Sequence, residues 1–173
     1  VKVDLNSDLS LTAAYFDSEA DKAGYDGSSA EYIVQRGLVV DGIELELKGK
    51  VNDNLDVTFG YTSMDGKNGT KDAREIPETM YSMWANYEVN PKLGWAVGVM
   101  HQGESLIKDG GTQMLPDYTR VDAAVYLMLS DDFRLQVNME NLTDELYFPH
   151  SHSTHQVSVG RERNIRLSLT RNF

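Results

Sequence analysis

Apolar residues in this chain recur at every second position, and this period limits the possible folds more than any other feature. In residues 43–51 apolar and charged side chains alternate, and a similar alternation returns in residues 55–62, 121–129, 135–140 and 165–173. Successive side chains of a β-strand point to opposite faces, so each segment is expected to be a strand with one apolar and one wet face. No segment has the spacing of an amphipathic helix. The chain is therefore predicted to be all-β and antiparallel.

The predicted strands are long. We expect nine, at residues 1–6, 9–18, 32–51, 55–65, 75–89, 93–103, 115–130, 133–142 and 162–173. Strands in soluble domains usually have about 5–6 residues, whereas tilted strands of about ten or more suit a bilayer about 30 Å thick. The alternation predicts a single outward apolar face that carries Leu45, Leu47, Val57, Phe59, Val137 and Leu169, with Glu44 and Glu46 on the opposite face.

The connections between these strands are of two lengths. Short polar turns begin at residues 6, 52, 90 and 130, and longer polar loops are expected near 19–31, 66–74, 103–114 and 143–161. Short turns at one end and long loops at the other are typical of an outer-membrane β-barrel. A complete bacterial barrel has an even number of strands. Nine strands, with residue 1 on the loop side, therefore predict the C-terminal part of a larger barrel.

Composition excludes several other classes of protein. The formal net charge is -11, which disfavours binding to a phosphate backbone, so no nucleic-acid partner is expected. The absence of cysteine excludes disulfide scaffolds, zinc-thiolate sites and thiol catalysis. The sequence also lacks a nucleophile elbow and a phosphate-binding glycine loop before a helix. We expect neither an enzyme nor a resident cofactor.

Several spaced motifs then resemble one family. The stretch from Pro116 to Tyr147, followed by residues 160–173, resembles the C-terminal strands of TonB-dependent outer-membrane receptors, most closely those for ferric siderophores. The segment Asn141-Leu142-Thr143-Asp144-Glu145-Leu146-Tyr147 matches their Asn-Leu-x-Asp-x-x-Tyr motif in the last long loop. The hairpin of residues 42–61 resembles an upstream hairpin of the family. The segment Tyr118-Thr119-Arg120-Val121-Asp122 resembles the start of the family's penultimate hairpin.

The resemblance implies an antiparallel transmembrane β-barrel of about 22 strands around a plugged lumen. Residues 1–173 would form a single, incomplete domain from its C-terminal part, with the plug absent. The implied function is uptake of a ferric siderophore or similar scarce ligand across the bacterial outer membrane, with iron present only in the bound chelate. The implied partners are outer-membrane lipid, the ligand, TonB through the missing N-terminal part, and the barrel-assembly machinery through the C-terminal strand.

Candidate ligand residues lie in the long loops, because a loop can vary on a rigid wall. Aromatic rings can stack on a planar chelate and arginine can pair with its charge, which selects Tyr25, Tyr32, Tyr147, Phe148 and Arg161. His150, His152 and His155 are weaker candidates for a metal site or for contact with an anionic ligand. Phe173 ends the apolar face and is the candidate assembly signal. Arg171 departs from the aromatic or apolar residue that the family usually has there.

Aromatic residues also predict interfacial girdles, without deciding which of them face lipid. The candidates are Tyr15, Phe59, Trp84, Tyr87, Trp95 and Tyr126.

Two other functions stay open at this point. One is a small self-contained barrel, in the outer membrane or soluble, that acts as a binding or adhesion module. The other is a soluble β-sandwich binding domain.

Overall fold

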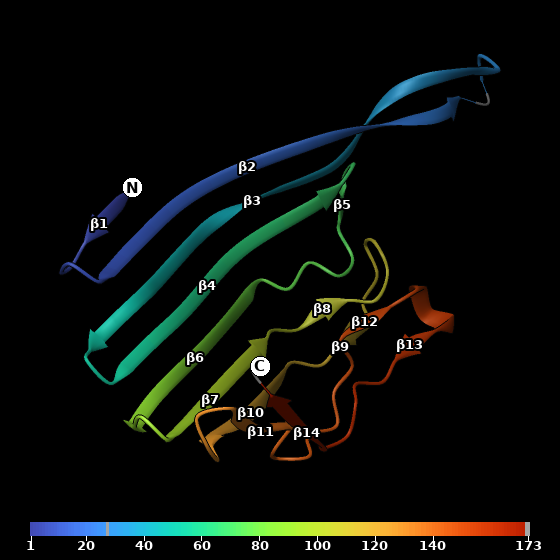
Figure 1. The fold of residues 1–173 in the computed structure, drawn as a ribbon. Helices are drawn as coiled ribbons and strands as arrows, with labels where there is room; N and C mark the ends of the chain where they lie inside the picture. The colour runs from blue at the N-terminus through green and yellow to red at the C-terminus, as the bar shows by residue number, and fades with distance from the viewer. Residues whose placement is uncertain (27, 172–173) are drawn as a thin grey trace.

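In the computed structural model, which describes residues 1–26 and 28–171, the chain forms one large antiparallel sheet and two short hairpins (Figure 1). The main strands confirm the nine predicted ones: β1 Lys2–Asp4, β2 Leu9–Asp26, β3 Glu31–Asn52, β4 Leu55–Asn68, β6 Thr79–Asn90, β7 Leu93–Gln102, β10 Tyr118–Met128, β11 Phe133–Glu140 and β14 Asn164–Arg171. The loops contain β5 Lys71–Asp72, β8 Ser105–Leu106, β9 Met114–Leu115, β12 His150–Ser151, the 3-10 helix η1 Ser153–His155 and β13 Val157–Ser158.

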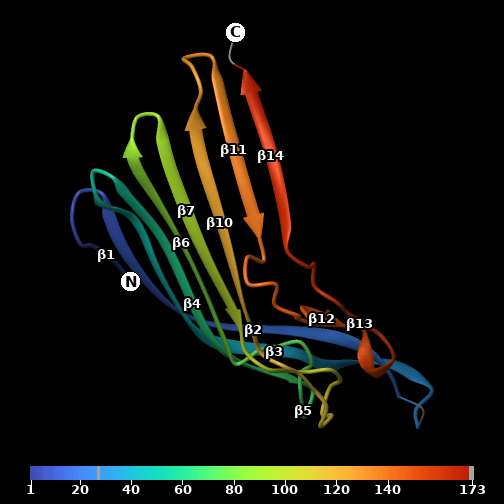
Figure 2. The same ribbon diagram turned by 90° about the horizontal axis from the view of Figure 1, so that it is seen from below.

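The strand order in the sheet follows the order in the sequence. The path is β1-β2-β3-β4-β6-β7-β10-β11-β14, and β5 pairs with β4. Figure 2 shows the short turns gathered at one end of a curved sheet and the longer connections at the other, as the sequence predicted. Among the described residues β1 pairs only with β2 and β14 only with β11, so the sheet is open at both edges. The same part of the chain has no helix that could cross a membrane.

Asparagine side chains close three of the short turns. The side-chain oxygen of Asn6 accepts hydrogen bonds from the backbone N–H groups of Asp8 and Leu9, at 2.7 and 2.8 Å. Asn52 and Asn90 do the same in the two following turns. This side chain mimics a backbone turn, which explains why these three turns could be recognised from their polar residues.

The register aligns the apolar residues of all these strands on one face, which we call the apolar face. Leu47 lies opposite Phe59, Phe59 lies opposite Met83, and Met83 lies opposite Val99 in successive strands. A parallel row toward the turns joins Val125, Val137 and Leu167. The six residues predicted to share a face therefore do so. Ile165, Leu167 and Leu169 are 61–68% exposed, so the face is not covered by other parts of the chain.

Aromatic residues border the apolar face at both ends. Toward the turns, the rings of Tyr87 and Trp95 lie 5.4 Å apart. Toward the loops, Tyr81 stacks on His101 with ring centroids 4.7 Å apart. Tyr81 and Tyr87 are six positions apart in β6, which at the usual rise of a strand is about 20 Å along the tilted strand.

The opposite face of the sheet, which we call the polar face, carries Glu46, Lys48 and Lys50. Trp84 and Tyr126 belong to this face, whereas Tyr15, Phe59, Tyr87 and Trp95 belong to the apolar one, since their cross-strand partners do. The Trp84 ring lies over Gly98, where a Cβ would overlap it, and its indole N–H donates to Asn86 at 3.0 Å. A glycine is thus required at this position to admit the ring.

The predicted loop near 19–31 is wrong. Most of it is strand, because β2 continues to Asp26 and β3 begins at Glu31, so this hairpin extends beyond its neighbours (Figure 1). The ladder pairs Asp21 through Asp26 with Arg36 back to Glu31, and a Glu19–Arg36 ion pair of 3.2 Å supports it. Polar side chains on both faces hide such a strand from periodicity analysis, since it has no apolar side to bury.

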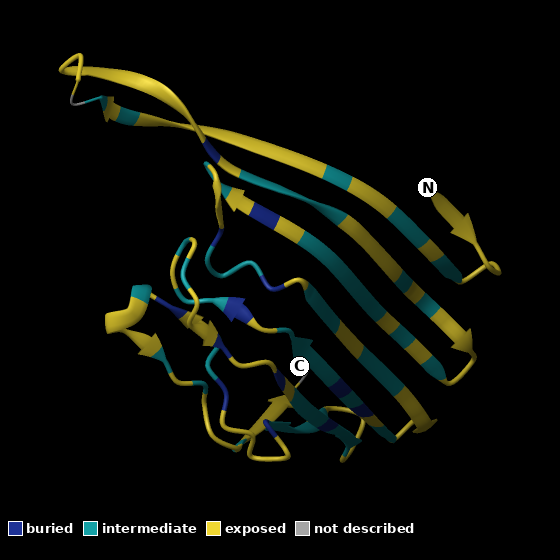
Figure 3. Ribbon diagram, turned by 180° about the vertical axis from the view of Figure 1, so that it is seen from behind, coloured by how far each residue is buried: buried dark blue, intermediate teal, exposed yellow. Residues whose placement is uncertain are grey.

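Few residues of the described chain are buried. Figure 3 shows exposed or half-buried residues over most of the sheet, while buried positions concentrate in the loops and in β7 and β10. Buried residues there include Ala96, Ala124, Leu115, Tyr118 and Tyr147. Residues 1–26 and 28–171 thus have no central hydrophobic core, which is expected of the wall of a membrane barrel.

The predicted last strand, residues 162–173, extends beyond the residues that the structure describes. Phe173, the candidate assembly signal, lies outside the described residues. Arg171 pairs with Phe133 across the sheet, and its guanidinium carbon lies 5.4 Å from the centre of that ring. The unusual arginine is therefore held against an aromatic face at the turn end.

Candidate functional site

The longer connections at the loop end of the sheet bind one another. We call residues 69–78, 103–117 and 141–163 the loop cluster. Glu75 links all three: its backbone N–H donates to the carbonyl of Leu106 at 3.0 Å, and its carboxylate accepts from the N–H of Ser151 at 2.7 Å. The Ser151 hydroxyl also donates to the carbonyl of Ile107 at 3.4 Å. Segments far apart in the sequence thus form one body.

Asp109 makes the second link of the loop cluster. One carboxylate oxygen accepts from the side-chain amide of Asn68 at 2.8 Å, and the other accepts from the backbone N–H of Arg74 at 2.8 Å. The adjacent Gly110 donates its N–H to the carbonyl of Asp72. The connection after β8 is therefore fixed to the end of β4 and to the segment that follows β5.

The Asn-Leu-x-Asp-x-x-Tyr motif shapes the start of the last loop. The Asn141 side chain, whose residue is 1% exposed, accepts from the N–H of Glu145 at 2.9 Å and donates to the carbonyls of Glu145 and Arg161. Asp144 accepts from the N–H of Arg163 at 2.9 Å. These bonds hold the outgoing and returning parts of the loop side by side.

Tyr147 differs from its predicted place in an open ligand loop. The residue is only 6% exposed, and its ring lies 4.7 Å from that of Tyr118. Arg120 donates to its hydroxyl at 3.2 Å, and Gly160 lies beneath the ring, where a Cβ would overlap it. The ring therefore packs inside the protein, and its role in ligand binding stays a prediction.

The other predicted ligand residues are accessible and lie in two separate places. Tyr25 and Tyr32 are 59% and 80% exposed and form an edge-to-face pair near the tip of the β2–β3 hairpin, with ring centroids 5.4 Å apart. Hydrogen bonds from Ser28 hold the pKa of the nearby Asp26 carboxyl below its usual value. Arg161 is exposed and Phe148 is half-buried in the last loop. Their role in ligand binding stays a prediction.

The histidines are only partly brought together. Nδ1 of His152 lies 3.3 Å from Nε2 of His155 around η1, while His150 belongs to β12. Within residues 1–26 and 28–171 no three histidine, aspartate or glutamate residues are arranged to hold a metal ion. The histidines therefore stay a prediction as contacts for a metal ion or an anionic ligand.

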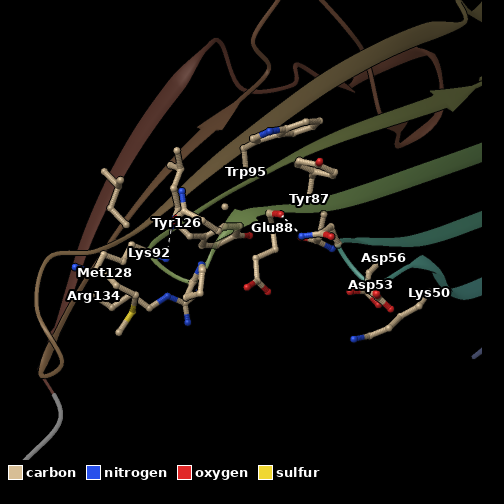
Figure 4. A pocket seen from close by; sticks show the side chains of 17 residues that line it. Lys50, Asp53, Asp56, Tyr87, Glu88, Lys92, Trp95, Tyr126, Met128 and Arg134 are labelled. Atoms are coloured by element: carbon tan, nitrogen blue, oxygen red, sulfur yellow. Dashed lines mark hydrogen bonds between the residues drawn. The ribbon is translucent and has the colours of Figure 1, made fainter.

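Two cavities lie on either side of the sheet's centre. One of about 600 Å³ lies at the base of the loop cluster and is lined by carboxylates, including Asp65, Glu78 and Glu104. The other, of about 330 Å³, lies at the turn end (Figure 4). There Lys50 and Glu88 point to the side opposite Tyr87 and Trp95, and Arg134 lies 5.0 Å from the Tyr126 ring. The turn-end cavity is remote from the predicted ligand loops.

Sequence reasoning missed Arg120 and Asp122 as site residues. Both lie in the segment that matched the family, but neither motif nor alternation indicates that they contact the last loop. Their NH2–Oδ2 distance is 2.8 Å, and the side chains are only 27% and 21% exposed. A charged pair so well shielded on the polar face is the signal that marks them in the structure.

The geometry described above agrees with a comparison against known families. The model of the TonB dependent receptor-like β-barrel family matches residues 2–142. The chain belongs to this family. Membership makes the segment part of an outer-membrane receptor barrel, as the sequence predicted.

Individual relatives of this receptor segment point the same way. The chain is 27% identical, over 95% of its length, to a probable TonB-dependent siderophore receptor, PiuA, of Acinetobacter baumannii, and 28% identical, over 94%, to the ferrioxamine receptor of Yersinia enterocolitica. It covers 25% of each of these relatives, so it spans about a quarter of their length.

Solved structures of receptors show the same fold. The crystal structure of PiuA from Acinetobacter baumannii superimposes with a TM-score of 0.85 at 26% identity, covering 98% of this chain and 27% of that one. The ferripyoverdine receptor of Pseudomonas aeruginosa, bound to ferripyoverdine, gives 0.82 at 22% identity, covering 98% and 25%. The second likeness concerns the fold alone.

Proposed function

We propose that this segment is the C-terminal part of a receptor that takes up a ferric siderophore across the outer membrane, energised through TonB. The family match over residues 2–142 carries the proposal. The names of relatives, a siderophore receptor and a ferrioxamine receptor, support the ligand class. Iron enters this protein only within the chelate, as cargo and not as a resident cofactor.

The remaining partners follow from the same proposal. Residues 1–173 supply wall and outer loops, while the plug and the TonB contact belong to the rest of the receptor. Lipid covers the apolar face between the two aromatic borders, and the C-terminal strand is the signal for barrel assembly. An open sheet with two unpaired edges disfavours a small self-contained barrel, and an apolar face exposed to its surroundings disfavours a soluble β-sandwich.

Uptake by cells tests this function directly. The full-length receptor is expressed in Gram-negative cells that lack their own siderophore receptors, and radioactive iron is supplied as hydroxamate or catecholate chelates. Accumulation is expected with at least one chelate and is expected to vanish in a strain without TonB. Equal accumulation with and without TonB, at equal receptor abundance, would reject the proposal.

We expect ligand contacts to come from the exposed loop residues. Replacing Arg161 with alanine, or Tyr25 and Tyr32 together, should weaken binding of the transported chelate about tenfold, since each change removes charge or ring area from an accessible site. Affinity is measured on purified full-length receptor. Alanine at Asp53 or Asp131, in the short turns, is the control and should leave affinity unchanged. Unchanged affinity in both loop variants would move the ligand site to another part of the receptor.

A further inference from the structure

The last loop is tied to the barrel wall at several points, and one of them is the Arg120–Asp122 pair. Arg120 lies on the polar face of β10, where its NH2 donates to Oδ2 of Asp122 at 2.8 Å and its NH1 donates to the Tyr147 hydroxyl at 3.2 Å. The other oxygen of Asp122 accepts from the backbone N–H of Asn141 at 2.8 Å. A continuous chain of hydrogen bonds thus runs from the wall to both Asn141 and Tyr147.

Both ends of this chain hold parts of the loop that lie far apart in the sequence. Asn141 is the residue at which the chain leaves β11, and its side-chain amide binds the carbonyl of Arg161 at 3.0 Å on the returning limb. Tyr147 binds the same limb through the N–H of Gly160, which donates to its carbonyl at 2.8 Å. Movement of Arg120 would therefore free the Tyr147 hydroxyl from the wall, and through Tyr147 it would loosen the returning limb at Gly160.

An arginine is needed for this arrangement, because its planar fork reaches two acceptors in different directions. The Arg120–Asp122 pair is also less exposed to solvent than the Arg166–Glu140 ion pair. Its side chains are 27% and 21% exposed, against 58% and 35% for Arg166 and Glu140 on the same face. Partial burial strengthens a charged hydrogen bond and makes the loss of one partner costly.

We infer that Arg120 is a positioning residue of the receptor: it fixes the last loop to the wall and so sets where the loop tip, residues 152–159, and Arg161 meet the ligand. The effect on ligand binding rests on the proposed function. The effect on the position of the loop does not, since the hydrogen bonds between β10 and the last loop are present in the structure. Arg120 acts through Tyr147, which it binds directly, and through Asp122, which in turn binds Asn141.

The structure offers closely matched variants to test this role. Arg120→Met removes the guanidinium group and with it the bonds to Asp122 and to the Tyr147 hydroxyl. Tyr147→Phe removes only the hydroxyl and leaves the ring between Tyr118 and Gly160. Arg134→Met and Tyr126→Phe are the controls, because this second arginine–tyrosine pair lies on the same face at the turn end and does not contact the last loop.

Loop position is measured first, without ligand. In full-length receptor, spin labels are placed at cysteines introduced for Thr154, in the loop tip, and Asp131, in a short turn. The distance distribution should be narrow in the unsubstituted receptor and both controls, broad in Arg120→Met and intermediate in Tyr147→Phe. If Arg120→Met does not fold, Tyr147→Phe decides. A distribution as narrow as the controls in the folded variants would overturn the inference.

Ligand affinity then separates this inference from the proposed function. With the transported ferric chelate as probe, Arg120→Met should bind about tenfold more weakly, and the controls should bind normally. A broad distribution with normal affinity would support the positioning of the loop but remove the loop tip from the ligand site. Weak affinity with a narrow distribution would reject Arg120 as a positioning residue while leaving the ligand class intact.

Discussion

Arginine in place of Met83 is expected to destabilise the receptor by about 2–4 kcal/mol, because this side chain lies on the apolar face between the two aromatic borders. Met83 is 41% exposed and lies between Phe59 and Val99 in neighbouring strands. A guanidinium there would have to enter lipid or bend toward water past rows of apolar neighbours. The change is measured as the free energy of unfolding of full-length receptor by urea in lipid vesicles.

The adjacent residue supplies the control for this prediction. Ser82 is exposed on the opposite face of the same strand, between Gly60 and Met100. Arginine at this position meets water or polar groups, so we expect a loss within about 1 kcal/mol. Equal losses at the two positions would show that the faces have been assigned wrongly, since both variants lie at nearly the same depth and differ mainly in direction.

Alanine in place of Gly160 is expected to displace Tyr147 and to destabilise the protein by about 1–3 kcal/mol. The added methyl group would overlap the hydroxyl end of the Tyr147 ring. The ring cannot easily move aside, since it packs on Tyr118 and its hydroxyl accepts from Arg120. Besides the free energy of unfolding, cleavage of the last loop by protease should become faster.

Gly60→Ala is the matched change for this second prediction. A Cβ at Gly60 would lie 3.6 Å from the Ser82 hydroxyl, an ordinary van der Waals contact. Stability and protease resistance should therefore stay close to those of the unsubstituted receptor. Resistance of the last loop in Gly160→Ala that matches the Gly60→Ala value would mean that Tyr147 is not confined as the structure shows.

The wall of the receptor could be predicted from its sequence because a sheet with one apolar and one polar face requires strict alternation along each strand. Residues such as Leu45, Leu47 and Phe59 alternate with polar ones, and asparagines mark the turns, so local patterns suffice to find each strand. The alternation does not reveal a strand whose two faces are both polar. Residues 19–26 form a strand without an apolar face, and only their pairing with β3 makes them one.

The loop cluster could not be predicted in the same way. Tyr147 looks accessible in the sequence, but it is buried because Gly160, which is distant along the chain, leaves room beneath its ring. The bond from Ser151 to Glu75 joins two polar residues that show no periodic pattern. Such contacts depend on how three connections meet in space, and no single segment carries information about the others.

The sequential order of the strands also has a consequence for biogenesis. Each hairpin bonds only to the hairpin before it and the one after it, so wall assembly can proceed by adding neighbours, with little entropy lost in closing long loops. The bond between Ser151 and Glu75 spans 76 residues and needs all the intervening strands in place. The receptor's outer surface would thus mature after its membrane wall, and a late intermediate would have complete ladders but unjoined loops that proteases outside the cell can reach.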